Sequence, residues 1–252
     1  MSDNIVKRDS IKKRIITRLT LAFERIDRFC VNKQIKKYKQ LVKAFSEVFL
    51  NALKISNYEK EIPGHELEHS FRVLELATII GCREKADLLK IILSSLLHDT
   101  GRILEEKLGE HHAVISARIA KTVLKNSQFS DHADEISKII MEHSFSAKKE
   151  PTCLESIILR DADMLDALGN IGIARVFAYG GYLGREIYES ILTFHTTSLD
   201  HFYDKILKLN NRIKTNLGKK LAERRLKKVL DFLKSMNEET DLKELEYIES
   251  QD

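Results

Sequence analysis

Residues 91–101, IILSSLLHDTG, place a histidine and an aspartate at the end of a very apolar segment. The spacing predicts a helix, and Gly101, two residues after Asp99, marks its expected end. A carboxylate in such a setting needs a partner, because an isolated charge away from water is costly. Adjacent helix positions diverge by about 100 degrees, so His98 and Asp99 can share an ion only at the helix end. Pairing of Asp99 with Arg102 at i+3 is the structural alternative.

The rest of the chain is also typical of helices. Of 252 residues, 43% are hydrophobic, and only 2 are proline and 10 glycine, so regular elements should be long and turns few. We expect an all-α protein, with residues 1–60 as a basic helical hairpin packed on a domain of residues 61–252. Apolar periodicity predicts helices near residues 5–29, 34–57, 66–80, 84–98, 111–125, 132–143, 153–178, 198–214 and 217–248.

Composition also bears on location and partners. No window approaches 18 consecutive apolar residues, and the charged N-terminus has no apolar segment after it, which predicts a cytoplasmic protein without a membrane span. Cys30, Cys82 and Cys153 are odd in number and lack CxxC spacing, so reduced thiols are expected. Residues 1–50 hold 13 Lys/Arg against 5 Asp/Glu. This excess could attract nucleic acid, but a solvated helix face is the favoured interpretation.

Other polar residues fall on predicted apolar faces. His69 shares a helical face with Val73 and Ile80, so its imidazole should point inward. A single inward histidine is more often a structural residue of the core. Asp163 and Asp166 lie at i,i+3 in an apolar run, where like charges repel. A divalent cation would relieve that repulsion and explain two carboxylates in an apolar setting.

With these residues combined, the sequence resembles the HD-domain phosphohydrolase superfamily, whose fold is a helical bundle. The resemblance covers roughly residues 63–230 and is strongest in GHELEHSFRVLELA, LLHDTGR, HHAVISARIA, IIMEHSFS and DADMLDALGNIGIARVFAYGG. Residues 161–181 resemble a subgroup of small bacterial and archaeal HD hydrolases that act on nucleotides or related phosphoesters.

The resemblance implies a set of metal ligands, namely His69, His98, Asp99 and Asp163. Mixed imidazole and carboxylate donors suit Mn, Fe, Co, Ni or Zn, with Mg less well matched, and manganese is favoured. A second metal through His112 and His143 is less favoured than contact of these two residues with substrate. The catalytic roles fall to Asp99 and to Asp166, which would orient the attacking water or hold a ligand imidazole.

A phosphorylated substrate also needs cationic anchors. Arg72 lies at i+3 from His69, on the side of its helix expected to face the metal. Arg175, in the family-like GIAR segment, and Lys205, in HFYDKILKL, are further anchors that the resemblance suggests.

The expected activity is metal-dependent hydrolysis of a nucleotide or related phosphoester. Release of pyrophosphate from a nucleoside triphosphate is slightly favoured over terminal phosphate removal or phosphodiester cleavage. Two alternatives stay open. One is a protein that binds nucleic acid through residues 1–50 and holds a structural metal; the other is a di-iron HD-type oxygenase, which requires His112 and His143 as ligands. Homo-oligomers are compatible with the sequence.

Overall fold

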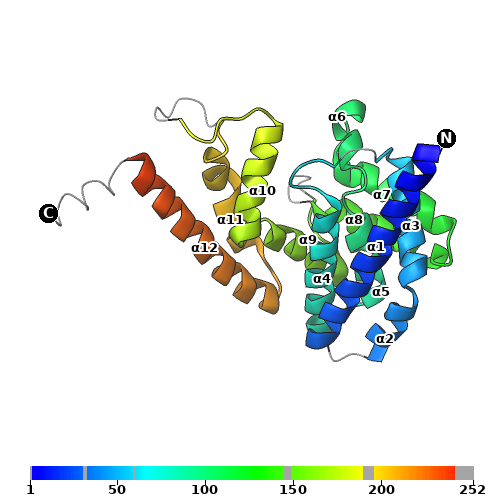
Figure 1. Ribbon diagram of the computed structural model, residues 1–252. Coiled ribbons are helices and arrows are strands. Elements are labelled where there is room, and N and C mark those ends of the chain that lie inside the picture. The colour runs from blue at the N-terminus through cyan, green and yellow to red at the C-terminus, as the bar shows by residue number, and fades with distance from the viewer. Residues whose placement is uncertain (1, 31–32, 59–60, 145–148, 190–195, 242–252) are drawn as a thin grey trace. The chain divides into compact units, whose positions relative to one another are not determined.

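The computed structural model is built from helices (Figure 1). It describes residues 2–30, 33–58, 61–144, 149–189 and 196–241, and within these ranges it contains no strand. The predicted all-α class is therefore confirmed. Each helix within the described part of the chain is too short or too polar to span a bilayer.

The helices follow one another with short connections. Up to residue 166 they are α1 (Ser2–Phe29), α2 (Lys33–Gln40), α3 (Val42–Ile55), α4 (Leu67–Glu84), α5 (Leu88–Leu97), α6 (Glu105–Leu108), α7 (His112–Lys125), α8 (Ala133–His143) and α9 (Leu154–Asp166). They continue as α10 (Gly169–Tyr182), a π-helical turn (Phe202–Ile206), α11 (Leu207–Leu209) and α12 (Asn216–Thr240). Short 3-10 turns occupy Arg102–Leu104, Ser130–His132 and Asn210–Arg212.

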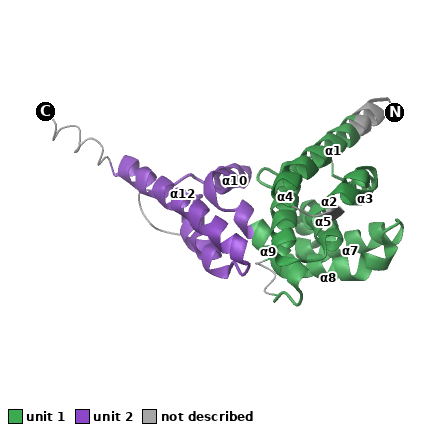
Figure 2. Cartoon of the chain, turned by 90° about the horizontal axis from the view of Figure 1, so that it is seen from below, with its two compact units in different colours: residues 1–163 green, residues 164–252 purple. Residues whose placement is uncertain are grey.

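The chain divides into two compact units, Met1–Asp163 and Met164–Asp252 (Figure 2). This division differs from the predicted boundary between residues 60 and 61, because the N-terminal helices lie within the first unit. In that unit α1 packs on both α3 and α4. In the second unit α10 packs on α12, and Phe177, Phe202 and Phe232 pack with their ring centroids 5.8 Å apart.

Charge pairs attach α1 to α4. Arg18 Nε donates to both carboxylate oxygens of Glu68, at 3.0 and 2.8 Å, and its guanidinium lies 5.1 Å from the centre of the Phe71 ring. Arg25 pairs with Glu75 at 3.3 Å. Part of the basic excess of residues 1–50 is thus neutralised inside the unit, which favours the packed extension over a polyanion-binding surface.

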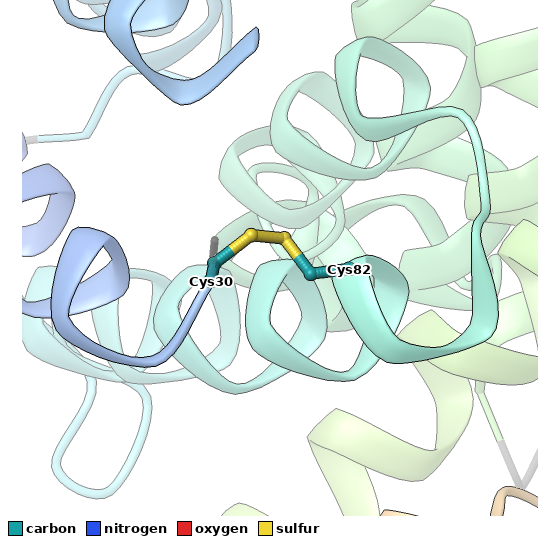
Figure 3. The surroundings of a disulfide bond; sticks show 2 residues. All are labelled: Cys30 and Cys82. Atoms are coloured by element: carbon teal, nitrogen blue, oxygen red, sulfur yellow. A yellow bond between two sulfur atoms is a disulfide. The ribbon is translucent and has the colours of Figure 1, made fainter. Parts of the chain in front are cut away.

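A disulfide between Cys30 and Cys82 joins the same two helices (Figure 3). Cys30 directly follows α1, Cys82 lies in the last turn of α4, and their Cα atoms are 5.8 Å apart. The expectation of reduced thiols is wrong for this pair, while Cys153 is free. The two cysteines are separated by 52 positions, so local spacing rules do not detect that their helices lie side by side.

Two predicted helices are interrupted. The helix expected over residues 34–57 breaks at Leu41 into α2 and α3, and the one expected over 153–178 breaks before Gly169 into α9 and α10. Gly169 has a φ of +76°, a conformation that glycine adopts without steric cost. The expected end of the last helix, near residue 248, lies outside the described residues.

The central helix of the first unit is α5, which packs against α3, α4, α7 and α8. Residues Ile91 to Leu97 are all buried. At its start, Asp87 caps the helix by accepting the backbone N–H groups of Leu89 and Lys90. Because α5 is enclosed by other helices, the histidine and aspartate at its C-terminal end are carried into the interior of the unit.

Candidate metal centre

Three elements bring the four predicted ligands together. His69 comes from the first turn of α4, His98 and Asp99 follow α5, and Asp163 comes from α9. From His69 Nε2 the distances are 3.2 Å to His98 Nε2, 3.6 Å to Asp99 Oδ2 and 3.3 Å to Asp163 Oδ1. Donor atoms bound at about 2.0–2.2 Å to one ion lie about 3–3.6 Å from each other. These spacings therefore fit a single cation.

Backbone carbonyls orient two of the imidazoles. His98 Nδ1 donates to the carbonyl oxygen of Ser95 at 2.7 Å, and His143 Nδ1 donates to that of Ile140 at 2.6 Å. A carbonyl can only accept, so the proton of each neutral ring is on Nδ1 and the Nε2 lone pair is free. Burial lowers the pKa of His98, and burial followed by the charge of His98 lowers the pKa of His143 to about 3.

The two oxygens of Asp99 face different neighbours. Oδ2 accepts from His65 Nδ1 at 3.0 Å, whereas buried Oδ1 has no hydrogen-bond partner. Burial alone would raise the pKa of Asp99, but Arg102 and His98, together with the hydrogen bonds of His65 and His69, hold it well below its usual range. An ionised oxygen that is buried and unpartnered is costly, so the residues around Asp99 fit a bound cation.

A second group of donors surrounds Oδ1 of Asp99. His112 Nε2 lies 3.6 Å from this oxygen, and His143 Nε2 lies 3.8 Å from it. The structure therefore places both histidines beside the pair of residues at the end of α5. An ion on this side would share Asp99 with an ion on the other side.

Asp163 is the donor contributed by α9. Burial raises its pKa, but the hydrogen bond and charge of His69, together with the charges of His98 and His143, hold it well below its usual range. A carboxylate that stays ionised beside three imidazoles is suited to binding a divalent cation.

Three further side chains at the centre carried no assigned role in the sequence analysis. His65 bonds Asp99, and Glu105 Oε1 lies 3.1 Å from His112 Nδ1. Arg102 Nη1 lies 3.0 Å from the same Nδ1 and 3.1 Å from Glu105 Oε2. These contacts depend on the short turn and helix that follow Asp99, which have too few residues to show a period.

The acidic and imidazole groups of Glu105, His111 and His112 are close enough to hold an ion of their own. The guanidinium of Arg102 already lies against two of them, and His111 Nδ1 caps α7 by accepting the backbone N–H of Ala113 at 3.2 Å. This group is therefore filled by protein donors rather than suited to a separate metal.

The predicted phosphate anchors have different surroundings. Arg72 is half-buried on α4, three residues after His69. In the second unit, Arg175 Nη1 donates to Asp166 Oδ2 at 2.9 Å, so the carboxylate predicted to assist catalysis is bonded by a predicted anchor. Lys205 lies in the π-helical turn.

The fold and these donors define a class of protein. Helices enclose a histidine–aspartate pair, with another histidine before it in the sequence and another aspartate after it, and this arrangement is that of metal-dependent hydrolases of the HD type. A family model described as HD domain matches residues 67–168.

Known proteins agree with this class. YpgQ of Bacillus subtilis (strain 168) is 31% identical over 183 residues, which span 71% of this chain and 86% of YpgQ. A crystal structure of Bacillus subtilis YpgQ in complex with ADP aligns with a TM-score of 0.59 and 28% identity, over 75% of this chain and 97% of that chain. An HD superfamily hydrolase from an uncultured Thermotogales bacterium aligns with a TM-score of 0.54 and 32% identity, over 77% and 91% of the two chains. The chain belongs to the HD-domain superfamily of metal-dependent hydrolases.

Proposed function

We propose that this protein hydrolyses a phosphate bond of a nucleotide, with a divalent ion held by His69, His98, Asp99 and Asp163. The observation that carries the proposal is the convergence of these four side chains on α4, α5 and α9. The structure of the related YpgQ with ADP supports a nucleotide as the substrate class. The donor set favours manganese, with Fe, Co, Ni, Zn or Mg as the alternatives.

The chain's own residues prepare the centre. When bound, a divalent ion lowers the pKa of a water molecule and polarises a phosphoryl oxygen. Asp99 contributes a carboxylate that its cationic and imidazole neighbours keep ionised. His98 enters as a neutral ring whose tautomer is fixed by the Ser95 carbonyl. Because these states are set before any ion arrives, little reorganisation opposes binding.

A second ion on the Oδ1 side of Asp99 is supported more strongly than the sequence suggested. His143 Nε2 is unprotonated and faces an ionised oxygen at 3.8 Å. Two acceptors facing each other without a proton between them are stabilised by a cation, and His112 Nε2 lies beside them. Under this proposal His112 and His143 act as ligands rather than as substrate contacts.

Substrate phosphates are proposed to be anchored by arginine and lysine side chains. Arg72, Arg175 and Lys205 are the candidates, because guanidinium groups bind phosphate bidentately and ammonium groups bind it as point charges. Asp166, held by Arg175 at 2.9 Å, is the proposed assisting carboxylate.

The test is a panel of nucleoside mono-, di- and triphosphates, cyclic nucleotides and a linear phosphodiester. The metal-stripped protein is resupplied with Mn, Mg, Ni, Co or Zn, and released phosphate and pyrophosphate are measured separately. Metal-dependent release from a nucleotide is expected, and the product distinguishes pyrophosphate release from terminal phosphate removal. Metal binding without release from any compound would contradict the proposal.

The positions of His112 and His143 also favour a second candidate, a di-iron oxygenase. That activity needs iron, so iron-reconstituted protein would be coloured and would consume oxygen in the presence of its substrate. A manganese or zinc form that hydrolyses nucleotides without consuming oxygen would exclude this candidate.

A further inference from the structure

We propose that Glu105 is a positioning residue that fixes the tautomer of His112 so that its Nε2 can bind a cation. The proposal rests on the proposed function, since it concerns the same centre. Glu105 is the first residue of α6, and its Oε1 lies 3.1 Å from both the ring Nδ1 and the backbone nitrogen of His112. One carboxylate oxygen thus contacts two donors of a single residue.

Two residues compete for the same ring nitrogen. Arg102 Nη1 is a donor and lies 3.0 Å from His112 Nδ1, while Glu105 Oε1 is an acceptor at 3.1 Å. If Nδ1 accepts from Arg102, the ring proton is on Nε2 and points toward Asp99 Oδ1 at 3.6 Å. The ring is then closed to a cation. If Nδ1 donates to Glu105, the Nε2 lone pair is open.

The surrounding contacts favour donation to Glu105. Its carboxylate also accepts the backbone N–H of His112 at the start of α7, where the helix dipole stabilises a negative charge. Arg102 has another acceptor, Glu105 Oε2 at 3.1 Å, so it loses little when Nδ1 carries the proton. The open tautomer satisfies both residues, whereas the closed one leaves the Glu105–His112 ring contact without a proton.

The first measurement is the tautomer of His112 in metal-free protein with ¹⁵N-labelled histidine rings. The His112→Gln variant assigns the signal. We expect the wild type to carry its proton on Nδ1, and we expect Glu105→Ala to move it to Nε2, next to Arg102. Glu105→Gln keeps an acceptor and should restore the wild-type pattern. The matched control is Glu106→Ala, since Glu106 is exposed and adjacent on α6. A wild type with its proton on Nε2 would overturn the proposal.

The second measurement is Co²⁺ binding by equilibrium dialysis with absorption spectra. Loss of such a supporting carboxylate typically weakens metal binding by about tenfold to a hundredfold, so Glu105→Ala should bind the second ion that much more weakly and the first ion unchanged. Equal affinities in Glu105→Ala and Glu106→Ala, or binding of only one ion by the wild type, would contradict the role of Glu105. Two bound ions without hydrolysis of any nucleotide would instead contradict the proposed function and leave this role intact.

Discussion

Two backbone carbonyls set the chemistry of individual residues in this centre. The carbonyls of Ser95 and Ile140 each accept from a histidine three positions later on the same helix. Helix geometry therefore supplies the partner of Nδ1 without a dedicated side chain. The result is that His98 and His143 present Nε2 lone pairs inward, in the state in which imidazole binds metals.

The buried ring of His143 makes metal-free stability depend on pH. Its pKa falls from an ordinary value of 6.5 to about 3 in the folded protein, so below about pH 6.5 the unfolded chain binds a proton that the folded one does not. Stability is then lost as pH falls. Between pH 7 and pH 5 this residue should contribute a loss of about 2 kcal/mol in the free energy of unfolding.

Urea unfolding of the metal-free wild type and of His143→Gln at both pH values measures this contribution. The variant should lose less stability over the interval, because it retains His98 but lacks the ring in question. An equal pH dependence of the two proteins would show that His143 is protonated in the folded state.

The ligand residues were accessible from sequence for a physical reason. His69 and the His98–Asp99 pair lie on long apolar helices, whose period shows which face is buried. Glu105 and His65 were not predicted to act, because each reaches the centre from a short turn. Helical periodicity carries no information there, and their contacts depend on tertiary structure.

Among the elements, the junction of α9 and α10 depends on one glycine. Gly169 has a φ of +76°, which costs an L-residue about 1 kcal/mol or more. Gly169→Ala should therefore lower the free energy of unfolding by about that amount. In Gly181→Ala an added Cβ meets no atom within 4 Å and the backbone φ is not positive, so this control should be neutral or slightly stabilising. Equal destabilisation in thermal or urea unfolding would contradict the assignment.

The disulfide between α1 and α4 should contribute to stability. A cross-link that closes a loop of this size typically adds about 2–4 kcal/mol. Reduction by a dithiol, or Cys30→Ser, should therefore lower the urea midpoint, and thiol counting should rise from one to three on reduction. Cys153→Ser is the control, because Cys153 is free. Three reactive thiols in the protein before reduction, after denaturation without reductant, would show that the pair is not cross-linked.

Element boundaries were the less predictable part of the fold. The apolar period continues through Leu41 and through residues 153–178, so the sequence signal alone does not reveal the breaks that the backbone makes there. The pairing of α1 with α4 was likewise hidden, since Arg18 and Glu68 are separated by 50 positions. Predicting it requires knowledge of which helix faces meet.

At the scale of the whole molecule, all four proposed ligands fall within the first unit, Met1–Asp163. They are far apart in the sequence and meet only when α4, α5 and α9 are packed. An ion that binds this folded unit and not the unfolded chain stabilises it by about 2.7 kcal/mol at a hundredfold excess over Kd. Metal binding, stability and hydrolysis are therefore expected to depend on the same residues.

The most direct test compares the wild type with Asp99→Ala and with Asp131→Asn, an exposed carboxylate outside the centre. Bound metal and the rate of nucleotide hydrolysis are measured on the same samples, with helical content from circular dichroism as the folding check. We expect Asp99→Ala to lose both metal and hydrolysis while remaining helical, and Asp131→Asn to retain both. A helical Asp99→Ala variant that binds metal and hydrolyses nucleotides at the wild-type rate would contradict the assignment of this centre.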